Sequence, residues 1–142
     1  MTLADALQKR VGFLQEVIGE LMLNDITAVH ARAEDLGHDP AFREQFDLCV
    51  SRAVAGLPEL SEYCLPLVKT GGIFAAYKSK TASEEARAAA SAIAVLGGTS
   101  EGTKQLILGP SGLERNFVLI RKTSPTPEKY PRAAGKIRKK PL

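Results

Sequence analysis

Cysteine is scarce in this sequence, and long apolar runs are absent. Cys49 and Cys64 are its two cysteines, and neither stands in a CxxC spacing or near a histidine, which excludes a disulfide scaffold and a zinc ribbon. The longest apolar run, around residues 88–96, is shorter than the roughly 18 to 20 residues that a membrane helix needs. The first residues, MTLADALQKR, lack the apolar stretch of a secretory signal. We therefore expect a cytoplasmic protein that does not insert into membranes.

The motifs of several enzyme classes are also missing. The chain has no GxSxG and no Walker sequence, and its glycine pairs stand where helices are predicted to end, an ordinary position for glycine. His30 and His38 are eight residues apart, with no third nitrogen or thiol at ligand spacing. These absences argue against a hydrolase, a nucleoside triphosphatase and a metal site.

Composition and charge describe one globular domain with a basic end. The chain has 142 residues, of which 44% are hydrophobic and 25% charged. Residues 121–142 carry eight basic side chains and one acidic one, a net charge of +7, whereas the other 120 residues carry 11 basic and 15 acidic ones, a net charge of −4. A basic tail on an acidic body indicates a polyanionic partner, nucleic acid before membrane. A solvated, disordered end explains the same charge equally well.

The apolar spacing predicts alternating strands and helices. An apolar stub closed by Asp5 precedes a helix whose apolar residues recur at steps of three and four from Leu7 to Leu21. Strands are predicted at 26–30, 46–50, 73–77, 105–108 and 116–120. The predicted fold is an α/β layered domain with a mainly parallel sheet and a C-terminal antiparallel hairpin, because crossover helices of this length join parallel strands.

Three further local patterns have structural consequences. Pro58 suits the first turn of a helix, and Thr81 and Glu84 have the spacing of a capping box that opens another. The prolines and basic residues after Lys122 predict an extended tail. In parallel sheets ligands bind at the carboxyl ends of the strands, which directs attention to the residues that follow each predicted strand.

Four positions at these strand ends are candidates for ligand contact. Asp5 could accept hydrogen bonds from ribose hydroxyls, although an N-cap is the reading that the residues alone favour. Ala33-Glu34 could offer a backbone amide and a carboxylate to an adenine edge, and a solvated loop explains the same letters. Arg52 follows a buried strand and could bind a carboxylate or phosphate with two hydrogen bonds. Lys78 occupies a similar but less distinctive position.

Several segments together resemble one family, the bacterial small-subunit ribosomal RNA guanine-N7 methyltransferases RsmG, also called glucose-inhibited division protein B. The resemblance covers the chain in family order, and the combination of its Ser-Arg-Ala and Tyr-Pro-Arg segments is more specific than either alone. The matching segments are Thr2-Leu3-Ala4-Asp5, Lys9-Arg10-Val11, Phe13-Leu14, Arg32-Ala33-Glu34-Asp35, Phe46-Asp47, Ser51-Arg52-Ala53-Val54-Ala55, Leu65-Pro66-Leu67-Val68-Lys69, Gly71-Gly72, Ala76-Tyr77-Lys78, 115–122, Lys129-Tyr130-Pro131-Arg132, Gly135 and Lys140-Pro141-Leu142.

The resemblance implies a Rossmann-like class I methyltransferase that uses S-adenosylmethionine and modifies N7 of a guanine in small-subunit rRNA. It implies that Asp5 holds the ribose, that Ala33 and Glu34 hold the adenine, and that Arg52 lies at the cofactor or substrate edge. N7 carries a free lone pair and loses no proton, so alignment with the methyl group is the main catalytic requirement. No catalytic acid, base or nucleophile is predicted. The residues expected to contact RNA are Lys78, Arg115, Lys129, Arg132, Lys139 and Lys140.

The resemblance also implies an incomplete domain. In the family a glycine-rich cofactor loop follows a strand that precedes the one at Thr2, so residues 1–122 are predicted to be a partial methyltransferase domain and 123–142 its basic tail. A truncated gene, a misplaced start or an incomplete cloned segment would each account for this. We expect the chain alone to bind cofactor poorly, and the complete protein to be monomeric. The alternatives are a non-catalytic RNA-binding remnant and, with less support, a nicotinamide-binding domain.

Overall fold

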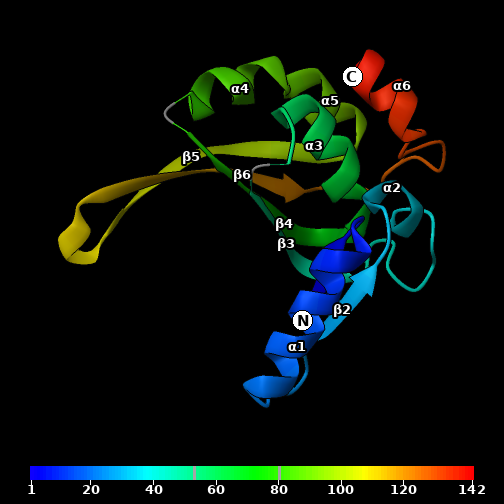
Figure 1. The fold of residues 1–142 in the computed structure, drawn as a ribbon. Coiled ribbons are helices and arrows are strands. Elements are labelled where there is room, and N and C mark those ends of the chain that lie inside the picture. The colour runs from blue at the N-terminus through cyan, green and yellow to red at the C-terminus, as the bar shows by residue number, and fades with distance from the viewer. Residues whose placement is uncertain (53, 80) are drawn as a thin grey trace.

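The computed structural model describes residues 1–52, 54–79 and 81–142 and has strands and helices in alternation (Figure 1). The strands are β1 (Thr2–Asp5), β2 (Thr27–His30), β3 (Phe46–Arg52), β4 (Val68–Lys78), β5 (Gly98–Leu108) and β6 (Leu113–Lys122). The helices are α1 (Gln8–Glu20), α2 (Ala33–Leu36), α3 (Leu57–Cys64), α4 (Ala82–Ala88), α5 (Ala90–Val95) and α6 (Ala134–Lys139). Short 3-10 turns lie at η1 (Leu65–Leu67) and η2 (Gly109–Ser111). Within the described residues no helix is both long and apolar enough to cross a membrane.

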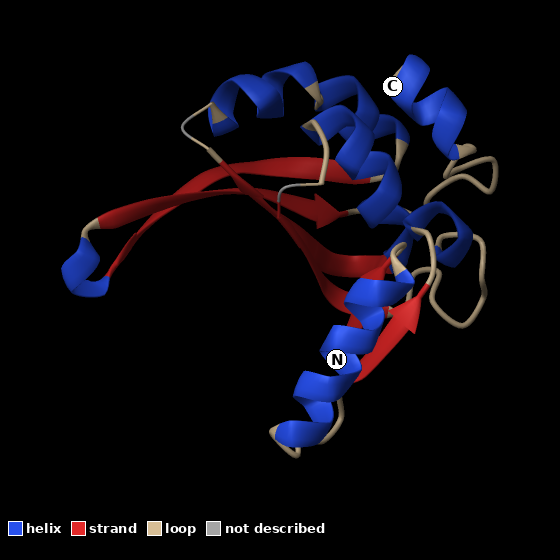
Figure 2. Ribbon diagram, in the orientation of Figure 1, coloured by secondary structure: helices blue, strands red, loops and turns tan. Residues whose placement is uncertain are grey.

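The strands form two sheets instead of the single sheet that the sequence predicts. β1 and β2 pair in parallel, and the second sheet has the order β3-β4-β6-β5. In it β3 and β4 are parallel, whereas β6 runs antiparallel to both β4 and β5. The predicted terminal hairpin is confirmed, but its strands are longer than predicted and extend beyond the body of the molecule (Figure 2).

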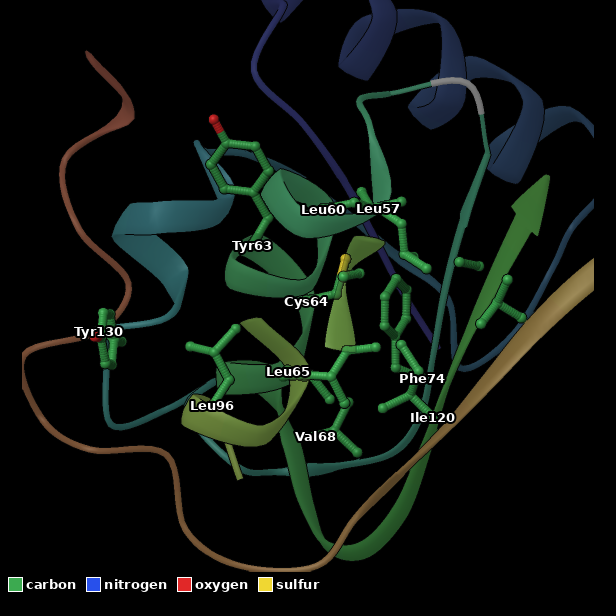
Figure 3. Close-up of a cluster of buried hydrophobic side chains, with 14 of the residues drawn as sticks. Leu57, Leu60, Tyr63, Cys64, Leu65, Val68, Phe74, Leu96, Ile120 and Tyr130 are labelled. Atoms are coloured by element: carbon green, nitrogen blue, oxygen red, sulfur yellow. The ribbon is translucent and has the colours of Figure 1, made fainter. Parts of the chain in front are cut away.

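Helices α3, α4 and α5 cover one face of the four-stranded sheet (Figure 2). Alternate residues of the strands point to this face, and Phe74 of β4 and Ile120 of β6 are fully buried there. Leu57 and Leu60 of α3 pack against them (Figure 3). Burying side chains of this size contributes about 1.5 to 3 kcal/mol each. The contacts between these helices and the sheet are therefore a main source of stability.

The opposite face of the same sheet is more open. Leu48 and Val50 of β3 alternate with Cys49, and their side chains are 56% and 68% exposed. The apolar stripe predicted from Leu7 to Leu21 is likewise incompletely covered, since Val11 is buried but Leu7 and Leu21, which flank α1, are exposed. The prediction of one buried face on α1 therefore holds for only part of its length.

The prediction of an extended tail is wrong, because residues 123–142 fold back onto the body. Tyr130 is buried, and Ile137 of α6 is fully buried in the core cluster that includes α3. The tail passes so close to Gly97 that a Cβ at this position would meet the Ser124 carbonyl, and Gly97 also has a φ of +82°. Glycine is needed here for both reasons.

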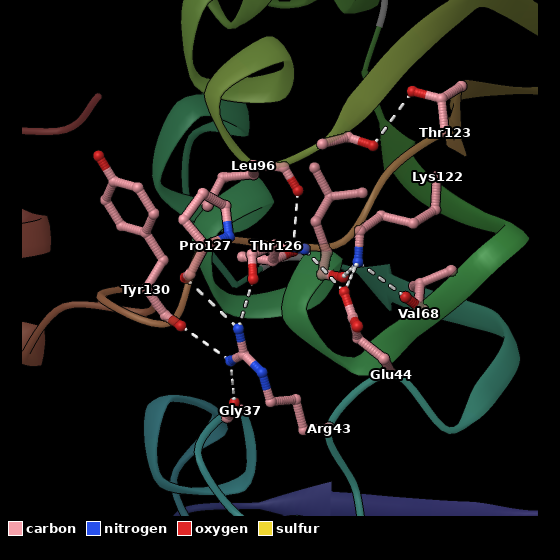
Figure 4. Close-up of polar contacts among 12 residues, drawn as sticks. Gly37, Arg43, Glu44, Val68, Leu96, Lys122, Thr123, Thr126, Pro127 and Tyr130 are labelled. Atoms are coloured by element: carbon pink, nitrogen blue, oxygen red, sulfur yellow. Dashed lines mark hydrogen bonds and ion pairs between the residues drawn. The ribbon is translucent and has the colours of Figure 1, made fainter.

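Two side chains from the segment before β3 hold the tail in place (Figure 4). Arg43 donates hydrogen bonds to the carbonyl oxygens of Tyr130 at 2.9 Å and Thr126 at 2.7 Å. Glu44 accepts from the Thr126 amide at 2.7 Å and from the fully buried Lys122 ammonium at 2.6 Å. Lys122 is thus a core residue of β6, and its charge is neutralised inside the fold.

The predicted capping box does not form. Thr81 precedes α4, but its side chain makes no capping hydrogen bond, and its hydroxyl lies 3.4 Å from the Glu85 carboxylate instead. The single helix predicted after Thr81 is also divided at Ala89 into α4 and α5. The second helix ends at Val95, two residues before the Gly97-Gly98 pair at which the sequence predicts its end.

Candidate functional site

A pocket of about 540 Å³ lies where β3 and β4 end and β6 begins. Because β3 and β4 are parallel, their last residues lie at the same end of the sheet. β6 runs antiparallel to β4, so its first residues lie at that end too. The position is the one expected for ligands of α/β sheets. Its polar and aromatic lining includes Arg52, Tyr77, Lys78, Glu114, Arg115 and Asn116.

An aromatic ring with two arginines forms one wall of this pocket. Tyr77 pairs with Arg52 across β3–β4 and with Phe117 across β4–β6. The guanidinium carbon of Arg52 lies 5.2 Å from the Tyr77 ring centroid, and that of Arg115 lies 5.9 Å from it. Phe117 meets the same ring edge-on, with centroids 5.2 Å apart. The arrangement brings two cations to one side of the sheet, where they can bind an anionic ligand.

Lys78 lies beneath this wall and is already engaged. Its ammonium is 2.7 Å from the Glu85 carboxylate and donates to the Ala55 carbonyl at 2.8 Å, and its side chain is only 9% exposed. Glu85 also accepts from the Leu57 amide at 3.2 Å. The predicted RNA contact at Lys78 is therefore placed as a link between α4 and the segment after β3. Ala53 of the Ser-Arg-Ala segment lies outside the described residues.

Asp5 ends β1 beside His30, the last residue of β2. Its carboxylate accepts from the Leu7 amide at 2.8 Å and from Arg10 at 3.2 Å. The Leu7 amide, assisted by Arg10 and His30, lowers the pKa of Asp5 below its ordinary value. Asp5 is thus an anion that bonds the backbone at the start of α1, as an N-cap would, and its side chain keeps 25% of its surface exposed.

Ala33 and Glu34 open the short helix α2, directly after β2. Ala33 packs against the core cluster, and the Glu34 carboxylate lies 3.9 Å from Arg32. These residues and Asp5 therefore belong to the two-stranded sheet, whereas Arg52, Lys78 and Arg115 gather at the four-stranded one. The structure divides the predicted site residues between the two sheets.

The basic residues predicted in the tail have different environments. Arg132 is bound to the fully buried Glu62 through two side-chain hydrogen bonds, of 2.8 and 2.7 Å. Lys129 lies over the ring of Tyr130 at 5.2 Å, and Lys139 and Lys140 are exposed at the end of α6. Arg132 is therefore paired with Glu62 inside the fold, whereas Lys139 and Lys140 are exposed and can contact a partner.

Sequence reasoning missed Tyr77 and Glu85 as parts of the site. Tyr77 is identified by its cross-strand neighbours, and Glu85 by the ion pair that it forms with Lys78 over a helix and a loop. Neither relation leaves a local pattern in the sequence. Among residues 1–52, 54–79 and 81–142, the His, Cys, Asp and Glu side chains form no cluster of three or more that could hold a metal ion.

Comparison with known sequences gives one consistent family. The family model described as "GidB: rRNA small subunit methyltransferase G" matches residues 1–117. Proteins named "Ribosomal RNA small subunit methyltransferase G" are 50% identical in Acetivibrio thermocellus, over 99% of this chain and 57% of the relative, and 44% identical in Clostridium novyi, over 100% and 58%. The corresponding protein of Lactobacillus johnsonii is 47% identical, over 100% and 59%. The chain thus spans less than two thirds of the length of these relatives.

Comparison with solved structures supports the fold. An rRNA methylase from Streptococcus thermophilus has a TM-score of 0.58 at 15% identity, over 87% of this chain and 73% of that one. A methyltransferase from Pyrococcus furiosus has a TM-score of 0.61 at 14% identity, over 87% and 62%. At these identities the likeness concerns the fold alone. The predicted Rossmann-like fold of class I methyltransferases is confirmed.

Proposed function

The chain belongs to the rRNA small subunit methyltransferase G family (GidB), and from this premise we propose that it forms the C-terminal part of an enzyme that methylates N7 of a guanine in small-subunit (16S) rRNA. The observation that carries the proposal is the pocket at the ends of β3 and β4, where Arg52 and Arg115 flank Tyr77. Arginine pairs with phosphate through two parallel hydrogen bonds, and aromatic rings contact bases. The pocket therefore suits an RNA segment presented at the sheet edge.

The chemistry of N7 fits what this pocket contains. The N7 atom carries a free lone pair and no proton, so the reaction needs no general base to deprotonate the nucleophile. Holding the base at a near-attack distance of roughly 3 to 3.5 Å from the methyl group is then the main task of the protein. Cationic side chains on rigid strands are suited to holding a polyanion in one orientation. Arg52 and Arg115 are the residues proposed for this role.

S-adenosylmethionine is the proposed cofactor, and when bound it supplies an electrophilic methyl group on a sulfonium. Asp5 fits its nucleoside half, because the carboxylate is anionic and partly exposed at the carboxyl end of a parallel strand. Glu34 and the backbone of Ala33, after the neighbouring strand β2, are proposed to contact the adenine. Arg52 is proposed to lie between the cofactor and the RNA.

We further propose that residues 1–122 are a partial methyltransferase domain. β1 and β3 each keep one edge without a strand partner within the described residues. On β3 the Ser51 hydroxyl is also buried without a hydrogen-bond partner among the described residues, which costs about 1 to 3 kcal/mol unless another group bonds it. A further strand between β1 and β3 would pair both edges. With that strand the protein is proposed to be a cytoplasmic monomer, and without it to bind cofactor poorly.

The experiment compares this chain with a fusion in which the part of the Acetivibrio thermocellus relative that this chain does not cover is joined to its N-terminus. Each protein is incubated with radiolabelled S-adenosylmethionine and small ribosomal subunits that lack the N7 methyl group. We expect methyl transfer by the fusion, a large loss in its Arg52→Ala variant, and none by the chain alone. An inactive but folded fusion would contradict the methyltransferase function.

Calorimetry tests the second part of the proposal, that residues 1–122 are a partial domain that binds cofactor poorly. The chain alone is titrated with S-adenosylmethionine, and its unfolding is followed by urea denaturation. Micromolar binding by a cooperatively folded monomer would contradict the partial domain. RNA binding with a steep salt dependence, combined with an inactive fusion, would instead favour the non-catalytic RNA-binding remnant, which keeps the exposed Lys139 and Lys140.

A further inference from the structure

We propose that Tyr77 is a positioning residue for RNA: its ring holds the guanidinium groups of Arg52 and Arg115, on the two strands beside it, in the orientation that contacts RNA phosphates. The inference rests on the proposed function of the pocket. It adds a role to a residue that does not itself need to touch the RNA.

The strand register makes this arrangement specific. Tyr77 lies near the end of β4, with Arg52 directly opposite on β3 and Phe117 directly opposite on β6. Arg115 stands two residues before Phe117 and thus projects from the same face of the sheet. In an antiparallel pair such as β4–β6, diagonal neighbours like Tyr77 and Arg115 lie about 7 to 8 Å apart, within reach of an aromatic ring and a long side chain. One tyrosine therefore contacts cations from both neighbouring strands.

The contacts fix the ring as well as the arginines. Phe117 packs edge-on against Tyr77 at an interplanar angle of 86°. The guanidinium carbons then lie 5.2 and 5.9 Å from the ring centroid, within the distance at which the negative face of the ring attracts a cation. Arg115 also donates from Nη1 to its neighbour's carbonyl, that of Glu114, at 2.9 Å. Both guanidinium planes are thereby restrained before any ligand arrives.

Restraint matters because an arginine loses rotamer freedom when it binds. A guanidinium that is already ordered loses less freedom on contact with phosphate, so its contribution to affinity rises. The attraction of the ring for each guanidinium also offsets part of the repulsion between the two like charges. Lys78, the third cation of the pocket lining, is already neutralised by Glu85 and does not need this help.

The matched variants are Tyr77→Phe, which keeps the ring, and Tyr77→Leu, which removes it. The full chain is labelled with ¹⁵N, and the Nε–Hε signals of Arg52 and Arg115 are assigned with Arg52→Lys and Arg115→Lys. We expect ring-current shifts of both signals in the wild type and in Tyr77→Phe, and their loss in Tyr77→Leu. This measurement needs no ligand.

Binding is then measured with a fluorescein-labelled single-stranded oligoribonucleotide over a range of salt concentrations. We expect Tyr77→Leu to bind about three- to tenfold more weakly than the wild type, with Tyr77→Phe close to the wild type. In an Arg115→Ala background the same Tyr77→Leu change should have a clearly smaller effect, because one of the two arginines that it orders is absent. Urea unfolding checks the fold of each variant, and Tyr77→Met replaces Tyr77→Leu where the latter is unstable.

The outcomes are distinguishable. Unchanged arginine signals in Tyr77→Leu, or equal RNA affinity of Tyr77→Leu and the wild type, would overturn the positioning role. A loss in Tyr77→Phe as large as in Tyr77→Leu would also overturn it, because the hydroxyl and not the ring would then be the active group. A further outcome is a folded wild type that shows the arginine shifts and yet binds no RNA. That result would contradict RNA binding at this pocket, both in the proposed function and in the role of Tyr77.

Discussion

Arg132 illustrates how a basic residue that is counted as part of a solvated tail can serve the core. Its guanidinium and backbone amide together give three hydrogen bonds to Glu62, a carboxylate with no exposed surface. Breaking a buried ion pair on one side is costly, because the remaining charge stays buried without compensation. We therefore expect Arg132 to contribute to stability, in addition to the RNA contact that the family resemblance predicts.

Replacing Arg132 with alanine is therefore expected to lower the free energy of unfolding by about 2 to 4 kcal/mol, less than for a fully enclosed pair because Arg132 is partly exposed. Lys139→Ala, at an exposed position of α6, is the control and should change it by less than about 0.5 kcal/mol. Urea unfolding followed by circular dichroism measures both. Equal effects of the two substitutions would mean that the ion pair contributes no stability.

Glu44 is expected to make the stability of the protein depend on pH. Burial alone would raise the pKa of Glu44, but the Lys122 ammonium and the Thr126 amide outweigh burial and lower it below the ordinary 4.5. The unfolded state then binds more protons than the folded state over the range just below pH 4.5, so stability falls as the pH falls through this range.

Glu44→Gln should therefore be less stable than the wild type at neutral pH, since Lys122 stays buried without a carboxylate, and should lose less stability between pH 5 and pH 3. Urea denaturation at a series of pH values measures this slope. The control is Glu16→Gln, at an exposed position of α1. An acid-range slope in Glu44→Gln identical to that of the wild type would exclude Glu44 as a source of the pH dependence.

At the scale of elements, α6 depends on few contacts, and Ile137 is the main one. This helix has six residues, too few to be stable alone in water, and Ile137 is its one buried side chain among the described residues. Ile137 packs into the cluster beneath α3. The stability of the last ten residues is therefore tied to Ile137, to the partly buried Leu142 on the same cluster, and to the Arg132–Glu62 pair that precedes them.

Ile137→Ala is expected to destabilise the docked tail by about 2 to 4 kcal/mol and to release residues 133–142 without unfolding the sheet. Hydrogen exchange should show faster exchange in α6, with the amides of β4 and β6 unchanged. Lys136→Ala, at an exposed position of the same helix, should leave exchange as in the wild type. Faster exchange throughout β4 and β6 would show instead that α6 unfolds together with the core.

At the scale of the whole molecule, the unpaired edges of β1 and β3 are the feature expected to control association of the chain with itself. An exposed strand edge with apolar side chains is a template for pairing with another chain. On β3 the unpaired edge coincides with the exposed Leu48 and Val50. A chain with this surface is expected to associate with itself unless another segment covers it.

Light scattering after size-exclusion chromatography should accordingly show association that increases with concentration. Val50→Lys, which places a charge on this edge strand, should weaken the association about tenfold or more. Val95→Lys, on the exposed side of α5, is the matched control and should have little effect. A wild-type chain that stays monomeric at every concentration would contradict this view of the β3 edge.

Sequence pattern determined the elements whose signals are local. The spacing of Leu7 to Leu21 identified α1, Pro58 marked the first turn of α3, and the ends of β3 and β4 pointed to Arg52 and Lys78, both of which line the pocket. Helix and strand periodicities arise between residues a few positions apart, so one sequence is enough to reveal them. The family resemblance added the expected cofactor and the strand expected to precede the one at Thr2.

Only the tertiary structure decided which residues meet across the sheets and what the basic side chains do. Tyr77 meets Arg52 and Arg115 because of strand register, and Arg132 meets Glu62 across 70 residues of chain. Such contacts depend on how distant segments cross, and no short pattern encodes that geometry. The scarcity of cysteine and of long apolar runs excluded whole classes of protein, but the fold decided which charges remain free for a partner.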